Sequence, residues 1–274
     1  MNKIEKRLRE VLARGEKGLI AYITAGDPDL ATTVELAVAM GEAGADVLEL
    51  GVPFSDPVAD GPAIQAASQR ALAGGVTVRG IIRAVEQIRR RSDIPLVLMT
   101  YYNPVYQYGP GRFAADAARA GANGLIVPDL PPEESGPLLE AAGDNQIDLI
   151  PLVTPNTPAR RLPVITGRAR GFIYCVSVTG VTGERESIMT DLAAMTDGVR
   201  SVTPLPVAVG FGISRPAQAA AVARHCDAVV VGSALVNTVA QKAGTPGLIK
   251  AVCEQVRELK EALTAREVQG VAAL

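Results

Sequence analysis

The chain has 274 residues, of which 48% are hydrophobic and 20% are charged, and its formal net charge is -2. This length and composition allow one large buried core, and single α/β barrels commonly have about 250 residues. The small net charge gives no electrostatic reason to expect nucleic acid or an anionic membrane as a partner.

The three cysteines, Cys175, Cys226 and Cys253, are far apart and lack the spacing of metal ligands. This pattern is typical of buried thiols in a reducing compartment. The first residues alternate between charged and apolar types and lack the apolar centre of a signal peptide. Every hydrophobic run is too short to span a bilayer. We therefore expect a soluble, cytoplasmic protein.

The first predicted element is a helix over residues 2–14, because its apolar residues recur at helical spacing. Eight short runs rich in valine, isoleucine and leucine follow. Most are continuously apolar, which is typical of parallel strands covered on both faces. The predicted strands are residues 19–24, 46–51, 96–101, 124–127, 148–153, 172–177, 207–210 and 228–232.

Helical patterns separate these strands, at residues 29–41, 78–91, 112–120, 133–142, 158–165, 188–202, 216–224 and 247–262. Extra helical turns are predicted to start at Pro62 and Ser233. The repeated alternation predicts a (β/α)₈ TIM barrel with an extra N-terminal helix and short extra helices after strands 2 and 8. A doubly wound open sheet is the alternative, but it more usually has about five or six strands. No linker interrupts the pattern, so residues 1–274 are expected to form one barrel domain.

The stretch from residue 48 to residue 65 contains an apolar strand, a loop with three prolines and the start of a helix. Glu49 interrupts the strand, and a buried carboxylate is costly unless it is paired or protonated. Asp60 lies near the end of the loop. Glu49 could be paired with an arginine and Asp60 could cap the helix, but stiff loops on a rigid scaffold are where functional residues concentrate.

Glycine-bearing loops follow strands 6, 7 and 8, and they include Gly212 and the pair Gly232-Ser233. Glycine lets backbone N–H groups approach an anion closely, and helix N-termini add unpaired donors. Each glycine alone is more often an ordinary turn residue. Together, at the strands where this fold usually binds phosphate, they predict a phosphate site.

Missing residue types exclude several chemistries. None of the six lysines lies at the C-terminal end of a predicted strand, which disfavours a Schiff-base aldolase or a pyridoxal phosphate enzyme. The single histidine, His225, precedes strand 8 at the opposite end of the barrel, which excludes a histidine triad or a histidine-rich zinc site. The remaining acid–base candidates are Glu49, Asp60, Asp129, Asp27 and Tyr174.

Glu49 should have a raised pKa because the strand that carries it is buried, whereas Asp60 in a polar loop should stay ionised. Two carboxylates in different environments can take complementary acid and base roles. With a phosphate site beside them, they predict proton-transfer chemistry on a small phosphorylated substrate.

The segment Leu-Glu-Leu-Gly-Val-Pro-Phe-Ser-Asp-Pro-Val-Ala-Asp-Gly-Pro at 48–62 resembles the signature of the tryptophan synthase α subunit family. This long motif is highly specific, whereas the glycine motifs alone fit many phosphate-binding barrels. The similarity covers the whole chain and includes Tyr-Ile-Thr-Ala-Gly-Asp-Pro at 22–28, Met-Thr-Tyr-Tyr-Asn-Pro at 99–104, Val-Pro-Asp-Leu-Pro at 127–131, Gly-Val-Thr-Gly at 180–183, Gly-Phe-Gly-Ile-Ser at 210–214 and Val-Gly-Ser-Ala at 231–234.

The resemblance implies a lyase of tryptophan biosynthesis that cleaves indole-3-glycerol phosphate to indole and glyceraldehyde 3-phosphate. It implies no cofactor or metal in this chain. It also implies an α₂β₂ heterotetramer, in which a pyridoxal phosphate-bearing β subunit receives indole through an internal channel.

By the same resemblance, Glu49 and Asp60 are the catalytic residues of a retro-aldol cleavage. Glu49 protonates the indole ring carbon, and Asp60 accepts a hydrogen bond from the indole N–H. Glu49, another residue or water then removes the proton of the glyceryl hydroxyl. The implied substrate-binding positions are Tyr22, Ile64, Tyr101, Tyr174, Thr182 and Phe211; the implied phosphate-binding positions are Gly183, Gly212, Gly232 and Ser233.

Two further features follow from the resemblance. Tyr22 departs from a phenylalanine that is common in the family, and a loop over about 178–190 should close on the substrate, with Thr182 bonded to Asp60. The face that meets the β subunit is implied to contain Pro53, Asp56, Asn103, Pro104 and Val105.

Three other functions compete with this one. Another phosphate-binding barrel is possible, such as a sugar-phosphate isomerase or indole-3-glycerol phosphate synthase, although the latter should show a strand lysine. The chain could also be a non-catalytic regulatory barrel or a free-standing lyase without a partner.

Overall fold

A computed structural model describes residues 2–176, 185–210 and 212–264 of the protein. The strands are β1 (Gly18–Thr24), β2 (Val47–Gly51), β3 (Leu96–Met99), β4 (Gly124–Ile126), β5 (Asp148–Leu149), β6 (Leu152–Val153), β7 (Ile173–Val176), β8 (Val207–Gly210) and β9 (Ala228–Val231). The helices are α1 (Lys3–Ala13), α2 (Leu30–Glu42), α3 (Pro62–Ala73), α4 (Val78–Arg89), α5 (Tyr102–Tyr108), α6 (Pro110–Ala120), α7 (Gly136–Asp144), α8 (Leu162–Thr166), α9 (Arg185–Arg200), α10 (Pro216–Ala223), α11 (Ser233–Lys242) and α12 (Leu248–Thr264), with a 3₁₀ turn at Ala159–Arg161.

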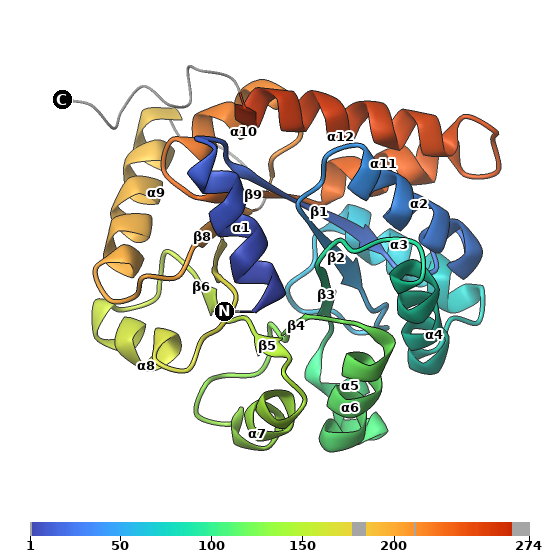
Figure 1. Ribbon diagram of the computed structural model, residues 1–274, viewed down its shortest axis with the longest axis horizontal. Helices are drawn as coiled ribbons and strands as arrows, with labels where there is room; N and C mark the ends of the chain where they lie inside the picture. The colour runs from blue at the N-terminus through green and yellow to red at the C-terminus, as the bar shows by residue number, and fades with distance from the viewer. Residues whose placement is uncertain (1, 177–184, 211, 265–274) are drawn as a thin grey trace.

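The strands form one parallel sheet in the order β5-β4-β3-β2-β1-β9-β8-β7-β6. The two ends of this order, β5 and β6, are consecutive in the chain and are separated only by Ile150 and Pro151. They are two halves of one predicted strand, so the sheet curls into an eight-stranded barrel with helices outside it (Figure 1). The predicted TIM barrel is confirmed.

The structure differs from the sequence prediction at several elements. The predicted fifth strand is divided at Pro151, which has no N–H to donate to a neighbouring strand. The expected turns at Pro62 and Ser233 are helices of 12 and 10 residues. Helix α5 was not predicted, because three tyrosines and a proline in seven residues give little helical signal.

Side chains alternate between the inside of the barrel and the outer layer of helices. On β2, Val47 belongs to the apolar cluster inside the barrel, whereas Leu48 and Leu50 belong to the cluster beneath the helices. Ile4 and Leu8 of α1 join the inner cluster, so α1 closes the N-terminal end of the barrel. The candidate site therefore lies at the opposite end of the barrel, where the strands have their C-terminal ends. No helix in the described ranges is long and apolar enough to cross a membrane.

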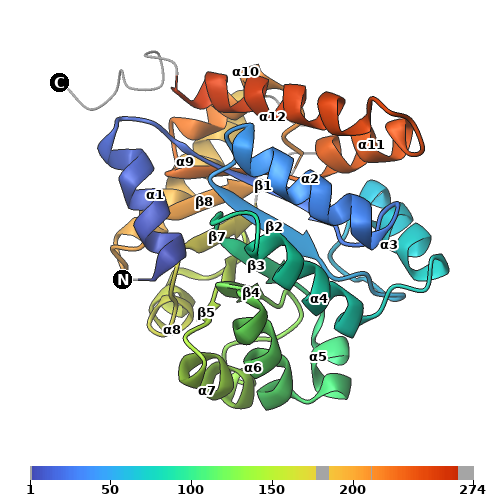
Figure 2. The ribbon, with the colours of Figure 1, turned by 45° about the vertical axis from the view of Figure 1, so that its right-hand side comes forward.

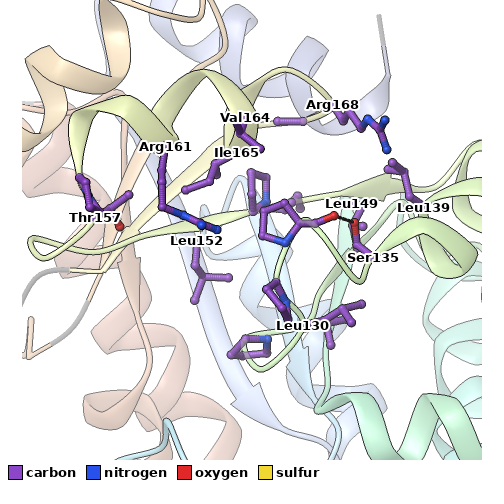
Figure 3. A pocket seen from close by; sticks show the side chains of 18 of the residues that line it. Leu130, Ser135, Leu139, Leu149, Leu152, Thr157, Arg161, Val164, Ile165 and Arg168 are labelled. Atoms are coloured by element: carbon purple, nitrogen blue, oxygen red, sulfur yellow. Dashed lines mark hydrogen bonds between the residues drawn. The ribbon is translucent and has the colours of Figure 1, made fainter.

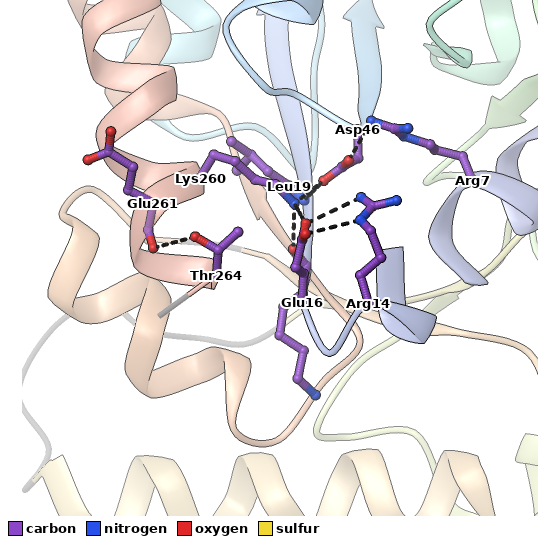
Figure 4. A network of polar contacts seen from close by, with 9 residues as sticks. Arg7, Arg14, Glu16, Leu19, Asp46, Lys260, Glu261 and Thr264 are labelled. Atoms are coloured by element: carbon purple, nitrogen blue, oxygen red, sulfur yellow. Dashed lines mark hydrogen bonds and ion pairs between the residues drawn. The ribbon is translucent and has the colours of Figure 1, made fainter. Parts of the chain in front are cut away.

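A buried carboxylate ties the two terminal helices to the barrel (Figure 4). Asp46, which is fully buried, accepts a hydrogen bond of 2.9 Å from the Leu19 N–H. It also forms ion pairs with Arg7 of α1 at 3.0 Å and Lys260 of α12 at 2.9 Å. Lys260 reaches Glu16 as well, at 3.1 Å. The network therefore joins α1, α12 and the first two strands.

Removing this carboxylate should destabilise the fold. We expect Asp46→Ala to lower the free energy of unfolding by about 3 kcal/mol, because a partly buried lysine and a backbone N–H lose their acceptor. Urea denaturation measures the change. Asp93→Ala is the matched control, since its ion pair with Lys3 is exposed and should contribute less than about 1 kcal/mol. Equal losses in the two variants would contradict the prediction.

Candidate active site

The inner face of the barrel opens, at the C-terminal ends of the strands, into a cavity of about 80 Å³. Residues predicted from sequence make up most of its lining. The lining residues are Tyr22, Glu49, Asp60, Gly61, Ile64, Met99, Tyr174, Gly212, Ile213, Val230, Gly232 and Ser233. The structure thus brings both predicted carboxylates together with the predicted glycine loops.

Glu49 lies on the inner face of β2, directly paired in register with Tyr22 of β1. Its side chain is 1% exposed, and its Oε2 atom has no hydrogen-bond partner in the described structure. Burial, with a smaller contribution from the nearby Asp60 carboxylate, raises the pKa of Glu49 to about 8. The expected raised pKa is confirmed, and Glu49 holds a proton at neutral pH.

Asp60 ends the loop that follows β2, two residues before α3 begins at Pro62. Burial raises the pKa of Asp60, and a hydrogen bond from the Tyr101 hydroxyl opposes that rise. The loop is therefore less polar around Asp60 than the sequence suggested. The Tyr101 hydroxyl offsets part of the effect of burial at Asp60, whereas among the described residues no hydrogen bond offsets it at Glu49, so the two acids have different environments.

Tyr101, predicted to contact substrate, supports the loop that carries Asp60. Its hydroxyl accepts a hydrogen bond of 2.9 Å from the Ala59 N–H, and its ring lies 5.4 Å from that of Phe54. Burial raises the pKa of Tyr101 to about 12, so the hydroxyl stays a donor toward Asp60. Tyr101 thus orients the acid.

Two glycines make room for the two tyrosines of the cavity. A Cβ atom at Gly51 would clash with the Tyr22 hydroxyl, and one at Gly210 would lie 2.5 Å from the Tyr174 hydroxyl. The Tyr22 hydroxyl lies 3.3 Å from Thr24 Oγ1, so its polarity is satisfied within β1. The hydroxyl that distinguishes Tyr22 from the phenylalanine common in the family is therefore paired within its own strand.

Three of the predicted phosphate-binding residues, Gly212, Gly232 and Ser233, belong to the described part of the chain, and all three line the cavity. Gly232 precedes α11, and Ser233 is its first residue, so unpaired N–H groups of the first helical turn lie at the cavity. Gly212 has a φ of 72°, a conformation that favours glycine, just before α10. Thr182, Gly183 and Phe211, together with residues 178–184 of the predicted closing loop, lie outside the described residues.

Other candidate acids have structural partners. Asp27 forms two hydrogen bonds with Arg70, and Asp129 accepts one of 2.8 Å from the Tyr102 N–H. Another carboxyl with a raised pKa, Asp148, starts β5 at the opposite end of the barrel. The described residues contain no group of three or more His, Cys, Asp or Glu side chains that could hold a metal ion.

Sequence reasoning missed some of the lining, notably Met99 and Val230. Met99 lies two residues after Val97, an inner-face residue of β3, and Val230 two residues after Ala228 of β9. Period-two alternation along the predicted strands would have found both, since residues i and i+2 share a face.

The predicted partner-facing positions divide into two groups. Asp56 and Asn103 are exposed, and Pro104 is partly exposed. Pro53 and Val105 are buried, and Val105 packs in the core beneath the barrel's helices, so these two positions can only support the exposed ones; their place in the partner-facing surface stays a prediction. Beside the exposed positions, Val58 is 82% and Tyr106 64% exposed.

A second cavity, of about 360 Å³, lies between α7 and α8 and shares no lining residue with the candidate active site (Figure 3). Its lining is mainly apolar, with several prolines and the guanidinium groups of Arg161 and Arg168 at its edge. Ser135 donates its hydroxyl to the Pro132 carbonyl within it, at 2.8 Å. No predicted catalytic or phosphate residue lines this cavity.

The chain is similar over most of its length to proteins of one family. The model of the tryptophan synthase alpha chain family matches residues 8–264. The chain is 49% identical over 263 residues to the tryptophan synthase alpha chain of Caldanaerobacter subterraneus, covering 96% of this chain and 100% of that one. It is 52% identical over 237 residues to the alpha chain of Citrifermentans bemidjiense, covering 86% and 89%. The crystal structure of tryptophan synthase subunit alpha from Legionella pneumophila has 39% identity and a TM-score of 0.88, covering 96% and 98%.

Proposed function

This chain belongs to the tryptophan synthase alpha chain family, and we propose that Glu49 and Asp60 carry out its reaction at the barrel mouth. It is a carbon–carbon lyase that cleaves indole-3-glycerol phosphate to indole and glyceraldehyde 3-phosphate, the alpha reaction of tryptophan biosynthesis. The observation that carries the proposed residue roles is the buried Glu49 carboxyl, whose Oε2 atom has no hydrogen-bond partner among the described residues and whose pKa of about 8 leaves it protonated beside a second acid.

The proposed mechanism begins with protonation. Glu49 donates its proton to the indole ring carbon that bears the glyceryl side chain, and the positive charge that develops on the ring is stabilised by Asp60 at the indole N–H. A base then takes the proton of the adjacent glyceryl hydroxyl. The carbon–carbon bond breaks, its electrons restore the indole ring, and the hydroxyl carbon becomes the aldehyde.

Glu49 can act twice in this sequence, because loss of its first proton makes it a carboxylate. It is then a candidate for the base on the glyceryl hydroxyl, with another residue or water as the alternative. The proposed site for the substrate phosphate is the N-terminus of α11, beside Gly232 and Ser233, because helix-end N–H groups favour an anion there. Gly212 completes this side of the proposed site.

The pKa of Glu49 predicts the pH dependence of the reaction. The protonated acid is present below about pH 8 and is lost above it, since burial raises the folded-state pKa to about 8. We expect kcat/KM for indole release to fall about tenfold per pH unit above that value. Assays from pH 6 to 10 at constant ionic strength, with circular dichroism to confirm folding, measure this. A flat profile to pH 10 would contradict the assignment of Glu49 as the acid.

We propose that the chain requires no cofactor of its own and partners a pyridoxal phosphate-bearing β subunit in an α₂β₂ heterotetramer. Support comes from a likeness to a chain in a crystal structure that is named for tryptophan synthase itself, from M. tuberculosis, with 36% identity and a TM-score of 0.87. The proposed docking face contains the exposed positions Asp56, Val58, Asn103 and Tyr106 and the partly exposed Pro104.

Indole release by the purified chain, with and without a matched β subunit, tests the whole proposal. We expect slow release by the chain alone and much faster release in the complex. No indole under either condition, with both proteins folded, would reject the catalytic assignment and favour a non-catalytic barrel. Fast release without any binding of the β subunit would favour a free-standing lyase.

A further inference from the structure

An ion pair between a buried carboxylate and a partly exposed arginine links the first loop of the barrel to helix α3. Asp27, two residues after the loop begins at Ala25, is 3% exposed. Arg70 of α3 donates to it through Nε at 2.9 Å and through its NH2 nitrogen at 2.7 Å. This two-point geometry fixes the orientation of both groups as well as their distance. Neither residue lines the cavity, and the proposed mechanism uses neither.

Helix α3 is not part of the outer ring of helices. In that ring α4 packs against α2 and α6, whereas α3 contacts α11 and β1. Figure 2 shows α3 on the side of the barrel opposite α1, which closes the other end. Helix α3 therefore lies at the barrel mouth, against α11 and β1 rather than between two ring helices.

The start of α3 supplies part of the active site. Asp60 and Gly61 immediately precede it, and Ile64 in its first turn lines the cavity. The Gln65 side-chain amide donates to the Asp60 carbonyl at 2.7 Å, so the Asp60 backbone moves with the helix. A shift of α3 would displace the acid and the apolar wall together.

Packing alone fixes α3 weakly. The apolar cluster that joins it to Tyr22 of β1 and Val236 of α11 uses Ala63, Ile64 and Ala67 of α3. Two of these three are alanines, which bury little area and interdigitate little with their neighbours. The other buried residues of α3, Ser68 and Ala71, are small as well, so the area that this helix buries against the barrel is modest.

The loop side of the ion pair, in contrast, is firmly held. The Gly26 N–H donates to Thr33 Oγ1 of α2 at 2.9 Å, and the Asp27 N–H donates to the Thr24 carbonyl at 3.3 Å. Gly26 has a φ of 88°, and a Cβ atom there would clash with Val76, so the loop follows a path that only glycine allows. Asp27 is thus fixed to the frame of β1 and α2.

We propose that Asp27 and Arg70 are positioning residues that hold α3 at the barrel mouth and thereby place Asp60 and Ile64 against the substrate. The inference rests on the proposed catalytic role of Asp60. Misplacing a reacting group by about 1 Å can lower the rate about 10²-fold. An enzyme whose α3 is released from this pair should therefore lose much of its turnover.

The test uses the chain in complex with its β subunit and measures indole release. We expect Arg70→Met to lower kcat at least about tenfold while KM changes less than about threefold, because Asp60 acts mainly in the transition state. Arg70→Lys should recover part of the loss. Arg91→Met is the matched control: it removes the two-point pair between Arg91, which follows α4, and Glu35 of α2, away from the mouth, and should keep kcat within about twofold.

A double-mutant cycle separates positioning from a general loss of stability. In an Asp60→Asn background, Arg70→Met should lower kcat/KM further by less than about threefold, since its effect passes through Asp60. Losses of tenfold or more in both backgrounds, or wild-type kcat in folded Arg70→Met, would overturn the inference. If Arg70→Met does not fold, the nearly isosteric Asp27→Asn tests the same pair by the same criteria. Wild-type activity of Asp60→Asn alone would instead reject the proposed catalytic role of Asp60, on which this inference rests.

Discussion

Glu49→Gln should lower kcat for indole release about 10³-fold while leaving the barrel folded. Glutamine keeps the shape of the side chain but has no acidic proton to give to the indole ring. The same change should stabilise the protein. The folded-state pKa of Glu49 is raised to about 8, so its ionisation opposes folding increasingly as pH rises from the unfolded-state pKa toward 8. The gain in unfolding free energy at pH 7.5 should be on the order of 2 kcal/mol.

Two measurements on the same variant check this prediction. Steady-state indole release gives kcat, and urea denaturation at pH 5 and pH 7.5 gives the stability difference, which should be larger at the higher pH. Glu86→Gln, on the exposed face of α4, is the control and should change neither quantity appreciably. Wild-type kcat in Glu49→Gln would show that this carboxyl is not the acid.

Asp60→Asn should lower kcat about 10² to 10³-fold, because the amide cannot stabilise positive charge on the indole ring as a carboxylate does. It should also change the residual pH profile. The Asp60 carboxylate contributes to the raised pKa of Glu49, so its removal should move the alkaline limb of kcat/KM to lower pH. Burial alone would still keep that pKa above its ordinary value.

The control for this second variant is Asp56→Asn in the same loop. Asp56 is exposed and lies outside the cavity, so the isolated chain should keep its kcat. An unchanged alkaline limb in Asp60→Asn, with reduced kcat, would show that the two acids do not interact electrostatically. An unchanged kcat would remove Asp60 from the mechanism.

The barrel was predictable because its strands are covered on both faces and therefore read as continuous apolar runs. Elements outside the barrel wall were harder to predict. Helix α5 has a weak helical composition and forms on the end of β3, where Tyr101 precedes it and Val105 packs into the core. Its formation also explains why Val105 is buried, which a motif on its own does not reveal.

The candidate site was predictable wherever a single residue was chemically out of place. A glutamate in an apolar strand is by itself enough to predict a raised pKa, which is what the fold gives Glu49. The environment of Asp60 was not predictable, because it depends on Tyr101, which is 41 positions later in the chain. The partnership of Asp27 with Arg70 was missed for the same reason, since 43 positions separate them.

The glycines beside the two cavity tyrosines make neighbouring strands dependent on one another during evolution. Gly51 of β2 can gain a side chain only if Tyr22 of β1 becomes smaller, whereas a Cβ atom at Gly210 of β8 would meet both Tyr174 of β7 and, at 2.9 Å, the Cβ atom of Val230 of β9. Gly51 can therefore change size only by a reciprocal exchange with Tyr22, and Gly210 only with changes on both neighbouring strands. Attempts to admit bulkier indoles should vary each tyrosine together with its glycine, because a library that varies one position alone samples mostly variants with a clash or an empty space.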